Sequence, residues 1–330
     1  MRLVMKCLNG QLSKVLAVSL TLSSTHATVA QTAYPETSVK IIVGFPAGTP
    51  PDAVARLLAE KMQASLGKPV LVESVPGAGG NIAADRVAKS KPDGHTLLLA
   101  GNASIVVNSS LYDKLPYDPM KDLLPISQVA TAPNMLVVNP QNSAGSVAEL
   151  VAFAKANPDE LTYGHAGAGI SQHLGAEVFK HMAGIKVRPV AYTGSSGILT
   201  DVLMNRVNIC FCSTGAALPH VKEGKLKALA VTSLKRTAAA PEVPTMDESG
   251  FKGFDVTVWY GLMAPASTPL PLIERLNQEV RSALAESDVR AKLEALGIVP
   301  IGSSPREFSA VIQTETPYWK AVVTELGLRR

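Results

Sequence analysis

The sequence predicts an α/β protein with two lobes. Short apolar runs rich in β-branched residues alternate with stretches whose apolar residues recur at helical spacing, starting at residue 39. This alternation occurs in two series, one on each side of residue 134, and each series predicts a parallel sheet with right-handed crossovers. The length of 330 residues also suits two domains of ordinary size better than one.

The first series predicts three strands joined by two helices. Its strands are short and apolar, its helices have apolar residues on one face, and Pro- and Gly-rich turns separate them. The expected elements are a strand at 40–45, a helix at 54–66, a strand at 70–73, a helix at 82–89 and a strand at 96–99.

The second series predicts the other sheet, and the chain then returns to the first. Its expected strands are at 135–139, 161–164, 188–192, 207–211 and 227–232, with helices near 147–154, 174–182 and 198–203. An extended run at 254–263 precedes helices at 271–286, 289–296 and 305–326. Because these last helices have few strands of their own, we expect them to pack on the first sheet.

The expected lobes follow from that return. Lobe I should comprise residues 35–133 and 254–330, and lobe II residues 134–253, so that the chain crosses between them twice. Two α/β lobes connected in this way have a cleft between them.

The N-terminus has the pattern of a secretory signal. Arg2, Lys6 and Lys14 precede an apolar run at 15–22, and small residues follow as far as Ala30. The run is far shorter than the ~20 residues that span a bilayer. A core helix is the alternative. We predict a signal peptide at 1–30, cleaved near Ala30, and hence an exported protein.

Charge and cysteine content exclude several classes of protein. Without residues 1–30 the chain has 28 Lys and Arg against 27 Asp and Glu, and it has no basic stripe of the kind that binds nucleic acid. No other segment is long and apolar enough to span a membrane. Cys210 and Cys212 lie two apart on one face of an expected strand, which favours packing over a mutual disulfide. The core alone would then hold the exported protein together.

The loops that follow the strands are the candidate binding elements. In open α/β sheets ligands bind at the carboxyl ends of the strands, where helix N-termini offer free N–H groups to anions. In the loop at 45–52, Gly48 permits close approach of a ligand and Thr49 offers a hydroxyl. The alternative is an ordinary turn in which Asp52 only satisfies first-turn amides. Similar loops occupy 163–173 and 192–197, and Asn102 follows the third strand.

No catalytic or cofactor motif accompanies these loops. The turn at 76–81 lacks the third glycine of a dinucleotide-binding fingerprint, since Ile82 stands there. Ser171 lacks the final glycine of a hydrolase elbow. His173 and His181 are eight residues apart, whereas two zinc ligands on one helical face need four. We therefore expect no enzyme, no metal and no cofactor. The pattern is that of a binding protein.

Motifs in a specific order indicate a family. The chain resembles the periplasmic solute receptors of tripartite tricarboxylate transporters, called Bug receptors, over residues 35–328. The resemblance lies in the segments 40–48, 52–66, 76–81, 92–94, 114–119, 171–174, 217–220 and 259–262.

The resemblance implies a type II periplasmic binding-protein fold, in which each lobe is a mostly parallel sheet flanked by helices. It also implies a periplasmic receptor that captures a small organic carboxylate (di-, tri- or aromatic) and delivers it to membrane permease subunits. We expect a monomer. The expected ligand contacts are Phe45, Pro46, Ala47, Gly48, Thr49, Asp52 and Asn102 in lobe I, and Gly169, Ser171, Gln172, His173, Thr193 and Gly194 in lobe II.

The chain departs from the family pattern at the expected site. Thr49, Pro50 and Pro51 replace the usual second glycine and the two residues after it, Thr193 replaces a Lys, and Cys212 replaces an Asp. Loss of that acidic side chain favours ligands without an amino group. Two alternatives remain: a ligand sensor for a membrane signalling partner, and a secreted α/β hydrolase that uses Ser171 with a histidine.

Overall fold

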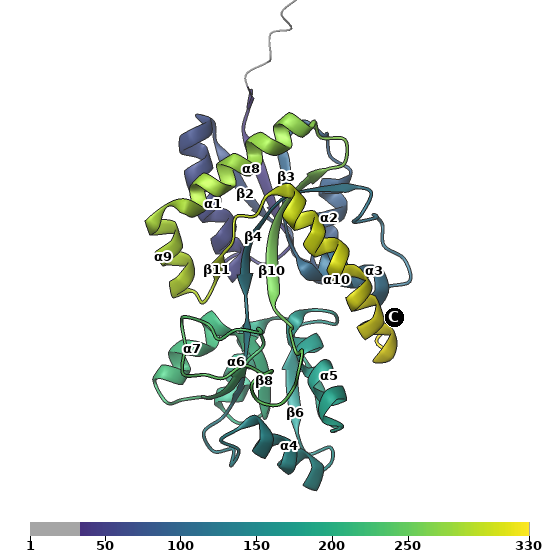
Figure 1. Cartoon of the computed structure of the whole chain (residues 1–330), viewed down its shortest axis with the longest axis vertical. Coiled ribbons are helices and arrows are strands. Elements are labelled where there is room, and N and C mark those ends of the chain that lie inside the picture. The colour runs from purple at the N-terminus through teal and green to yellow at the C-terminus, as the bar shows by residue number, and fades with distance from the viewer. Residues whose placement is uncertain (1–33, 330) are drawn as a thin grey trace, which may run out of the picture. The chain divides into compact units, whose positions relative to one another are not determined.

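The computed structural model describes residues 34–329, so the predicted signal at 1–30 lies outside the described residues. Two separate sheets flanked by helices make up this part of the chain (Figure 1). We call the part built on the first sheet lobe I and the part built on the second sheet lobe II. This is the two-lobed α/β architecture that the sequence predicts.

The first sheet has six strands in the order β11-β4-β10-β3-β1-β2. They are β1 (Val39–Val43), β2 (Val70–Ser74), β3 (Thr96–Gly101), β4 (Leu123–Ala132), β10 (Val258–Pro265) and β11 (Val299–Pro300). The helical elements of this lobe are α1 (Pro50–Leu66), η1 (Ala78–Gly80), α2 (Asn81–Ala88), η2 (Ala103–Val107), α3 (Asn108–Leu111), α8 (Leu270–Ala285), α9 (Ser287–Ala295) and α10 (Pro305–Glu325).

The second sheet has five strands in the order β7-β6-β8-β5-β9. They are β5 (Asn134–Val138), β6 (Thr162–His165), β7 (Arg188–Ala191), β8 (Ile209–Ser213) and β9 (Lys227–Val231). The helices of lobe II are α4 (Val147–Ala156), α5 (Ser171–Ala183), α6 (Ser195–Leu203) and α7 (Thr214–Lys222).

Both sheets are mixed, but most strands of each sheet share one direction, which agrees with the mostly parallel sheets that the sequence predicts. β1 pairs in parallel with β2 and β3, but β10 is antiparallel to both β3 and β4. In lobe II, β5 is likewise antiparallel to β8 and β9. The opposing strands include those by which the chain enters a sheet from the other lobe: β5 follows β4 of the first sheet, and β10 follows β9 of the second. A strand that enters a sheet in this way needs no crossover helix, so its direction is not set by one.

The C-terminal helices pack on the first sheet, as predicted. α8 and α10 both contact β4, and α8 also contacts α1. Trp259 of β10 meets Phe308 of α10 edge to face, with ring centroids 5.1 Å apart. Gly261 makes room for this contact, because a Cβ there would lie 2.1 Å from the Phe308 ring. The last third of the chain therefore completes the lobe that the first third begins.

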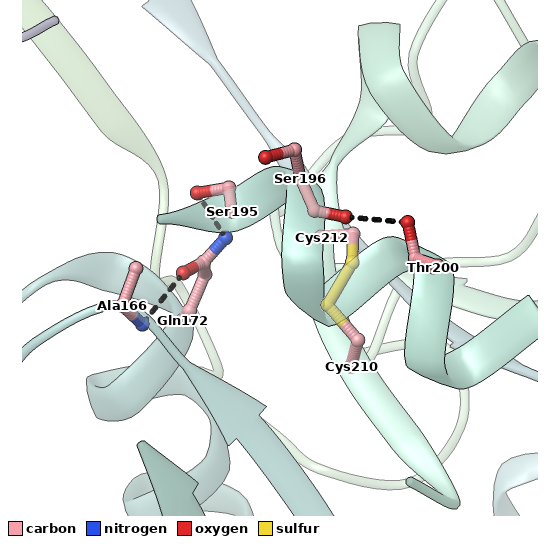
Figure 2. The surroundings of a disulfide bond; sticks show 7 residues. All are labelled: Ala166, Gln172, Ser195, Ser196, Thr200, Cys210 and Cys212. Atoms are coloured by element: carbon pink, nitrogen blue, oxygen red, sulfur yellow. Dashed lines mark hydrogen bonds between the residues drawn. A yellow bond between two sulfur atoms is a disulfide. The ribbon is translucent and has the colours of Figure 1, made fainter. Parts of the chain in front are cut away.

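Cys210 and Cys212 form a disulfide within β8, so the expectation of two free packed cysteines is wrong (Figure 2). Alternate residues of a strand point to the same face, which brings both sulfurs together. Their Cα atoms are 5.2 Å apart, well inside the range that a disulfide can join. Because the disulfide joins residues two apart in one strand, it links no two elements, and the expectation that the core holds the protein together stays an expectation.

Candidate functional site

The loop before α1 is organised around the carboxylate of Asp52, whose side chain is buried. Its Oδ2 accepts hydrogen bonds from the Gly48 amide (3.0 Å) and from Arg56 Nε (2.9 Å). Its Oδ1 accepts from Arg56 Nη2 (3.1 Å) and from Ser74 Oγ (3.3 Å). Burial raises the pKa of Asp52, but the hydrogen bonds from Arg56, Gly48 and Ser74 outweigh it and hold the pKa below its ordinary value. Four internal donors thus occupy both oxygens of the carboxylate.

The first turn of α1 offers few donors to an anion. Thr49 is the N-cap residue, and Pro50 and Pro51 fill the first two helical positions. Proline has no N–H, so two of the amides that a helix N-terminus normally exposes are missing. The Thr49 hydroxyl donates to Pro46 O (2.6 Å), and the Gly48 amide is used by Asp52. Gly48 has φ +78°, a conformation that favours glycine.

The other residues predicted in lobe I have different surroundings. Phe45 lies against Gly101, where a Cβ would be 2.8 Å from its ring, and meets Tyr260 edge to face. Asn102 is buried, and its Nδ2 donates to Thr257 O (3.3 Å). Pro46 and Ala47 are exposed. Phe45 and Asn102 thus join the loops to β10 and the segment before it.

In lobe II, Gln172 joins two helix N-termini. Its Oε1 accepts from the Ala166 amide (3.2 Å), and its Nε2 donates to Ser195 Oγ (3.0 Å), as Figure 2 shows. Gln172 is the second residue of α5 and Ser195 the first of α6. The two helices therefore begin next to each other, each at the carboxyl end of a strand.

Neither helix has a side-chain cap. Ile170 is the N-cap residue of α5, and Gly194 is that of α6. Within the described residues, no acceptor is bonded to the first-turn amides of Ser171, Gln172, Ser195, Ser196 and Gly197. The positive ends of two helix dipoles therefore lie next to each other, and these amides are donors for an anion.

Two buried histidines shape the loop before α5. His165 Nδ1 accepts from the Gly167 amide (3.3 Å), and His173 Nδ1 accepts from the Gly169 amide (3.5 Å). Their ring centroids are 5.0 Å apart. The histidines thus hold two amides of a glycine-rich loop in fixed directions. Thr193, one residue before the α6 N-cap Gly194, is exposed.

The structure joins some of the predicted residues and leaves others apart. Gln172 bonds to Ala166 and Ser195, and the Gly169 amide bonds to His173, so these predicted residues form two separate hydrogen-bonded groups in the loop and first turn of α5. Across the part of the chain that the structure describes, no hydrogen bond or ion pair links the loop at 45–52 to lobe II. Two surface hollows, of about 610 and 290 Å³, are lined by lobe I residues, and none of those residues was predicted to contact a ligand.

Three supporting residues were missed by the sequence reasoning. Arg56 and Ser74 hold the Asp52 carboxylate, and Ser195 receives the Gln172 amide. A signal existed for Arg56, because it lies four residues after Asp52, the spacing of an ion pair on a helix. Ser74 lies on another element, and no local pattern indicates its contact.

Residues 34–329 contain neither a cluster of metal ligands nor a membrane helix. Among these residues, no group of three or more His, Cys, Asp or Glu side chains could hold a metal ion. No helix in the same part of the chain is long and apolar enough to cross a bilayer.

The chain is similar to known solute receptors. A family model described as tripartite tricarboxylate transporter family receptor matches residues 54–328. Protein BugT of Bordetella pertussis is 35% identical over 320 residues, which cover 97% of this chain and 98% of BugT.

Solved structures are similar along nearly their whole length. Rpa4515 of R. palustris with adipate has a TM-score of 0.83 and 32% sequence identity, covering 89% of this chain and 98% of its own. MatC of Rhodopseudomonas palustris with bound malate has a TM-score of 0.80 and 33% identity, covering 88% and 100%. Both were solved with a small dicarboxylate.

Proposed function

Because the chain belongs to the tripartite tricarboxylate transporter receptor family, we propose that it captures a small organic carboxylate and delivers it to membrane permease subunits. Membership of a receptor family makes it a solute-binding protein. The adipate and malate held by two similar structures support a carboxylate as the ligand. Absence of enzymatic activity is part of the proposal.

The observation that carries the proposal is the pair of uncapped helix N-termini in lobe II. Five first-turn amides of α5 and α6 have no acceptor among the described residues, and Gln172 keeps the two helices together. A hydrogen bond to a charged group contributes about 1.5–3 kcal/mol. Three or four such bonds would support a micromolar affinity of about −8 kcal/mol after the cost of bringing the lobes together.

The loop at 45–52 has a different role in this proposal. With its carboxylate occupied by Arg56, Ser74 and the Gly48 amide, Asp52 shapes the loop and does not contact the ligand. Phe45 and Gly48 would then form a wall of the cleft, facing the less polar part of the ligand.

The location and boundaries of the mature protein are also proposals. We take residues 1–30 as a cleaved signal, the periplasm as the location, and a monomer as the working form. Two solved structures with 33% and 34% identity, described as a periplasmic transporter and as the periplasmic binding protein BugD, support that location. Lobe I would comprise 35–133 and 254–330, and lobe II 134–253.

A pair of substitutions at Ser171 tests the proposal. Ser171 is the first residue of α5 and follows an extended N-cap residue, so proline is tolerated there. S171P removes the amide donor, whereas S171A removes only the hydroxyl. Calorimetric titration with adipate and with malate should show about tenfold or greater loss of affinity in S171P. In S171A the affinity should be nearly that of the wild type.

Equal affinity of S171P and wild type for a bound acid would contradict the amide site. If neither acid nor any other carboxylate raises the melting temperature of the wild-type protein, the ligand class itself is wrong. S171A also examines the hydrolase alternative, since ester turnover that disappears in this variant would identify Ser171 as a nucleophile.

A further inference from the structure

Gly169 of lobe II fits closely against lobe I. Its φ is +77°, and a Cβ at this position would lie 2.4 Å from Leu111 Cδ2 and 3.1 Å from Asn108 Oδ1. Asn108 and Leu111 are the first and last residues of α3, and both are buried. A glycine is therefore required here for two reasons, the backbone conformation and the contact with the other lobe.

Asn108 is held from behind by other lobe I residues. Its Nδ2 donates to Asn81 Oδ1 (2.7 Å), and the Tyr117 hydroxyl lies between Asn81 Oδ1 (3.0 Å) and Ser104 O (2.6 Å). These bonds fix the Asn108 side chain at the lobe boundary.

The side-chain oxygen of Asn108, unlike its Nδ2, takes no part in these hydrogen bonds. The residue is 1% exposed, and Oδ1 has no hydrogen-bond partner among the described residues. An unsatisfied buried acceptor destabilises the arrangement that buries it, and opening to water would hydrate it. The contact with Gly169 thus combines favourable packing on Leu111 with a polar group that favours separation.

The loop that makes this contact is the one that leads into α5. The Gly169 amide donates to His173 Nδ1, and Ser171 begins the helix two residues later. Other contacts between the lobes lie elsewhere. A Cβ on Gly215 of α7 would lie 2.0 Å from Leu296 O, and His181 Nε2 lies 2.9 Å from Glu325 Oε1. Of these three contacts, the one at Gly169 touches the loop that precedes the amide donors.

We propose that Asn108 and Leu111 are positioning residues for the α5 loop. They receive Gly169 when the lobes are together, which sets the direction of the amides at the start of α5. The unpartnered Asn108 oxygen keeps this contact reversible. The effect on ligand binding rests on the proposed function, whereas the contact between the lobes does not.

A double-mutant cycle without ligand tests the contact. G169A introduces a methyl group against Leu111, and L111A removes the atoms that it would meet. Gly167 is the matched control, since it lies in the same loop at φ +144° but a Cβ there meets nothing within 4 Å. We expect G169A to lower the melting temperature in both backgrounds. The decrease should be at least about 2 °C larger in the wild-type background than in the L111A background. The cost of G167A should be the same in both.

An equal cost of G169A in both backgrounds would overturn the contact. A positioning role also predicts a change in ligand kinetics that a merely structural role does not produce. Adipate, used as the probe, should dissociate about tenfold faster from G169A than from G167A. Equal dissociation rates alongside a positive cycle would leave the contact standing and overturn its role in positioning. If adipate does not bind the wild type, the proposed function fails for this acid, and the ligand-free cycle still decides whether the contact exists.

Discussion

The helix N-termini of the two lobes differ in what they offer an anion. In lobe I, α1 begins with two prolines and its loop encloses the carboxylate of Asp52. In lobe II, α5 and α6 begin side by side with uncapped amides and a neutral bridge, Gln172. Both loops connect a strand to a helix, yet the first turns of α5 and α6 offer more donors than the first turn of α1, where two prolines have no N–H. Resemblance of loop position therefore does not imply equal capacity for binding.

The difference also concerns how each loop keeps its shape. The first depends on the buried carboxylate of Asp52, which accepts from an amide, a hydroxyl and the guanidinium of the exposed Arg56. The second depends on neutral acceptors, the Gln172 amide oxygen and the histidine Nδ1 atoms. A neutral support places no negative charge beside the site for an acid. The ionic support of the first loop gives stability that depends on the ionisation of Asp52, so the two loops should respond differently to substitution and, in the acid range of a carboxylate, to pH.

The largest expected effect comes from D52A. It leaves the Gly48 amide and Ser74 Oγ without their acceptor, whereas the exposed Arg56 turns to water, and from the lost hydrogen bonds to a charged group we expect a loss of about 3 kcal/mol in the free energy of unfolding, measured by urea denaturation. D52N is the matched control, because it keeps one acceptor oxygen and should lose less. Adipate affinity should fall less than in S171P, since the amides of lobe II remain. If adipate affinity fell more in D52A than in S171P, the first loop and not the amides of lobe II would be the main binding element.

Q172A should have the next largest effect. It removes two hydrogen bonds of a buried side chain, to the Ala166 amide and to Ser195 Oγ, at a cost of about 2 kcal/mol. Gln313 on α10 is an exposed control whose Nε2 donates to Ser309 Oγ one turn away, so Q313A should change stability by less than ~0.5 kcal/mol. Because α5 and α6 lose their link, Q172A should also weaken acid binding. Unchanged binding would show that the two helices do not act together.

The disulfide in β8 should contribute only modestly to the free energy of unfolding, although it is a covalent bond. It closes a loop of only three residues, for which the chain-entropy model gives about 1.5 kcal/mol. The double variant C210A/C212A should therefore lose about that much in urea denaturation. The disulfide of lobe II should therefore contribute less to the free energy of unfolding than the Asp52 carboxylate of the first loop does. A loss greater than that of D52A would put the disulfide first instead.

Local patterns predicted the α/β class and the return of the C-terminal helices, because both depend on the period of apolar residues. β4 was not predicted, since Pro125, Ser127 and Gln128 interrupt its apolar pattern and its pairing with β10 is not local. The cysteines share a strand face, as expected, but spacing alone does not show how closely a real strand brings two Cα atoms together.

The site shows the same limit. The loops could be found from glycine and proline, whereas the use of each polar atom could not. The bonds of Asp52 to the Gly48 amide and to Arg56 are local, four residues apart, whereas its bond to Ser74 spans 22 residues and has no local signal. The contact of Gly169 with Leu111 joins two lobes, and no periodicity within either segment encodes it.

The smallest expected effect is the loss of stability at acid pH that comes from Asp52 of the first loop. The folded pKa of Asp52 lies below its ordinary value, so below about pH 4 the unfolded chain binds this proton more readily than the folded chain. The stabilisation by Asp52 is thus complete above the unfolded pKa and is lost as the pH falls through the folded pKa. One group changes stability by at most about 1.4 kcal/mol per pH unit.

Wild type should therefore lose more stability than D52N between pH 5 and pH 3, measured by urea denaturation at each pH. Other carboxylates with lowered pKa values, such as Asp247 beside Lys252 in lobe II, contribute equally to both proteins and cancel in the difference. Parallel curves for the two proteins would mean that the buried carboxylate does not hold the first loop.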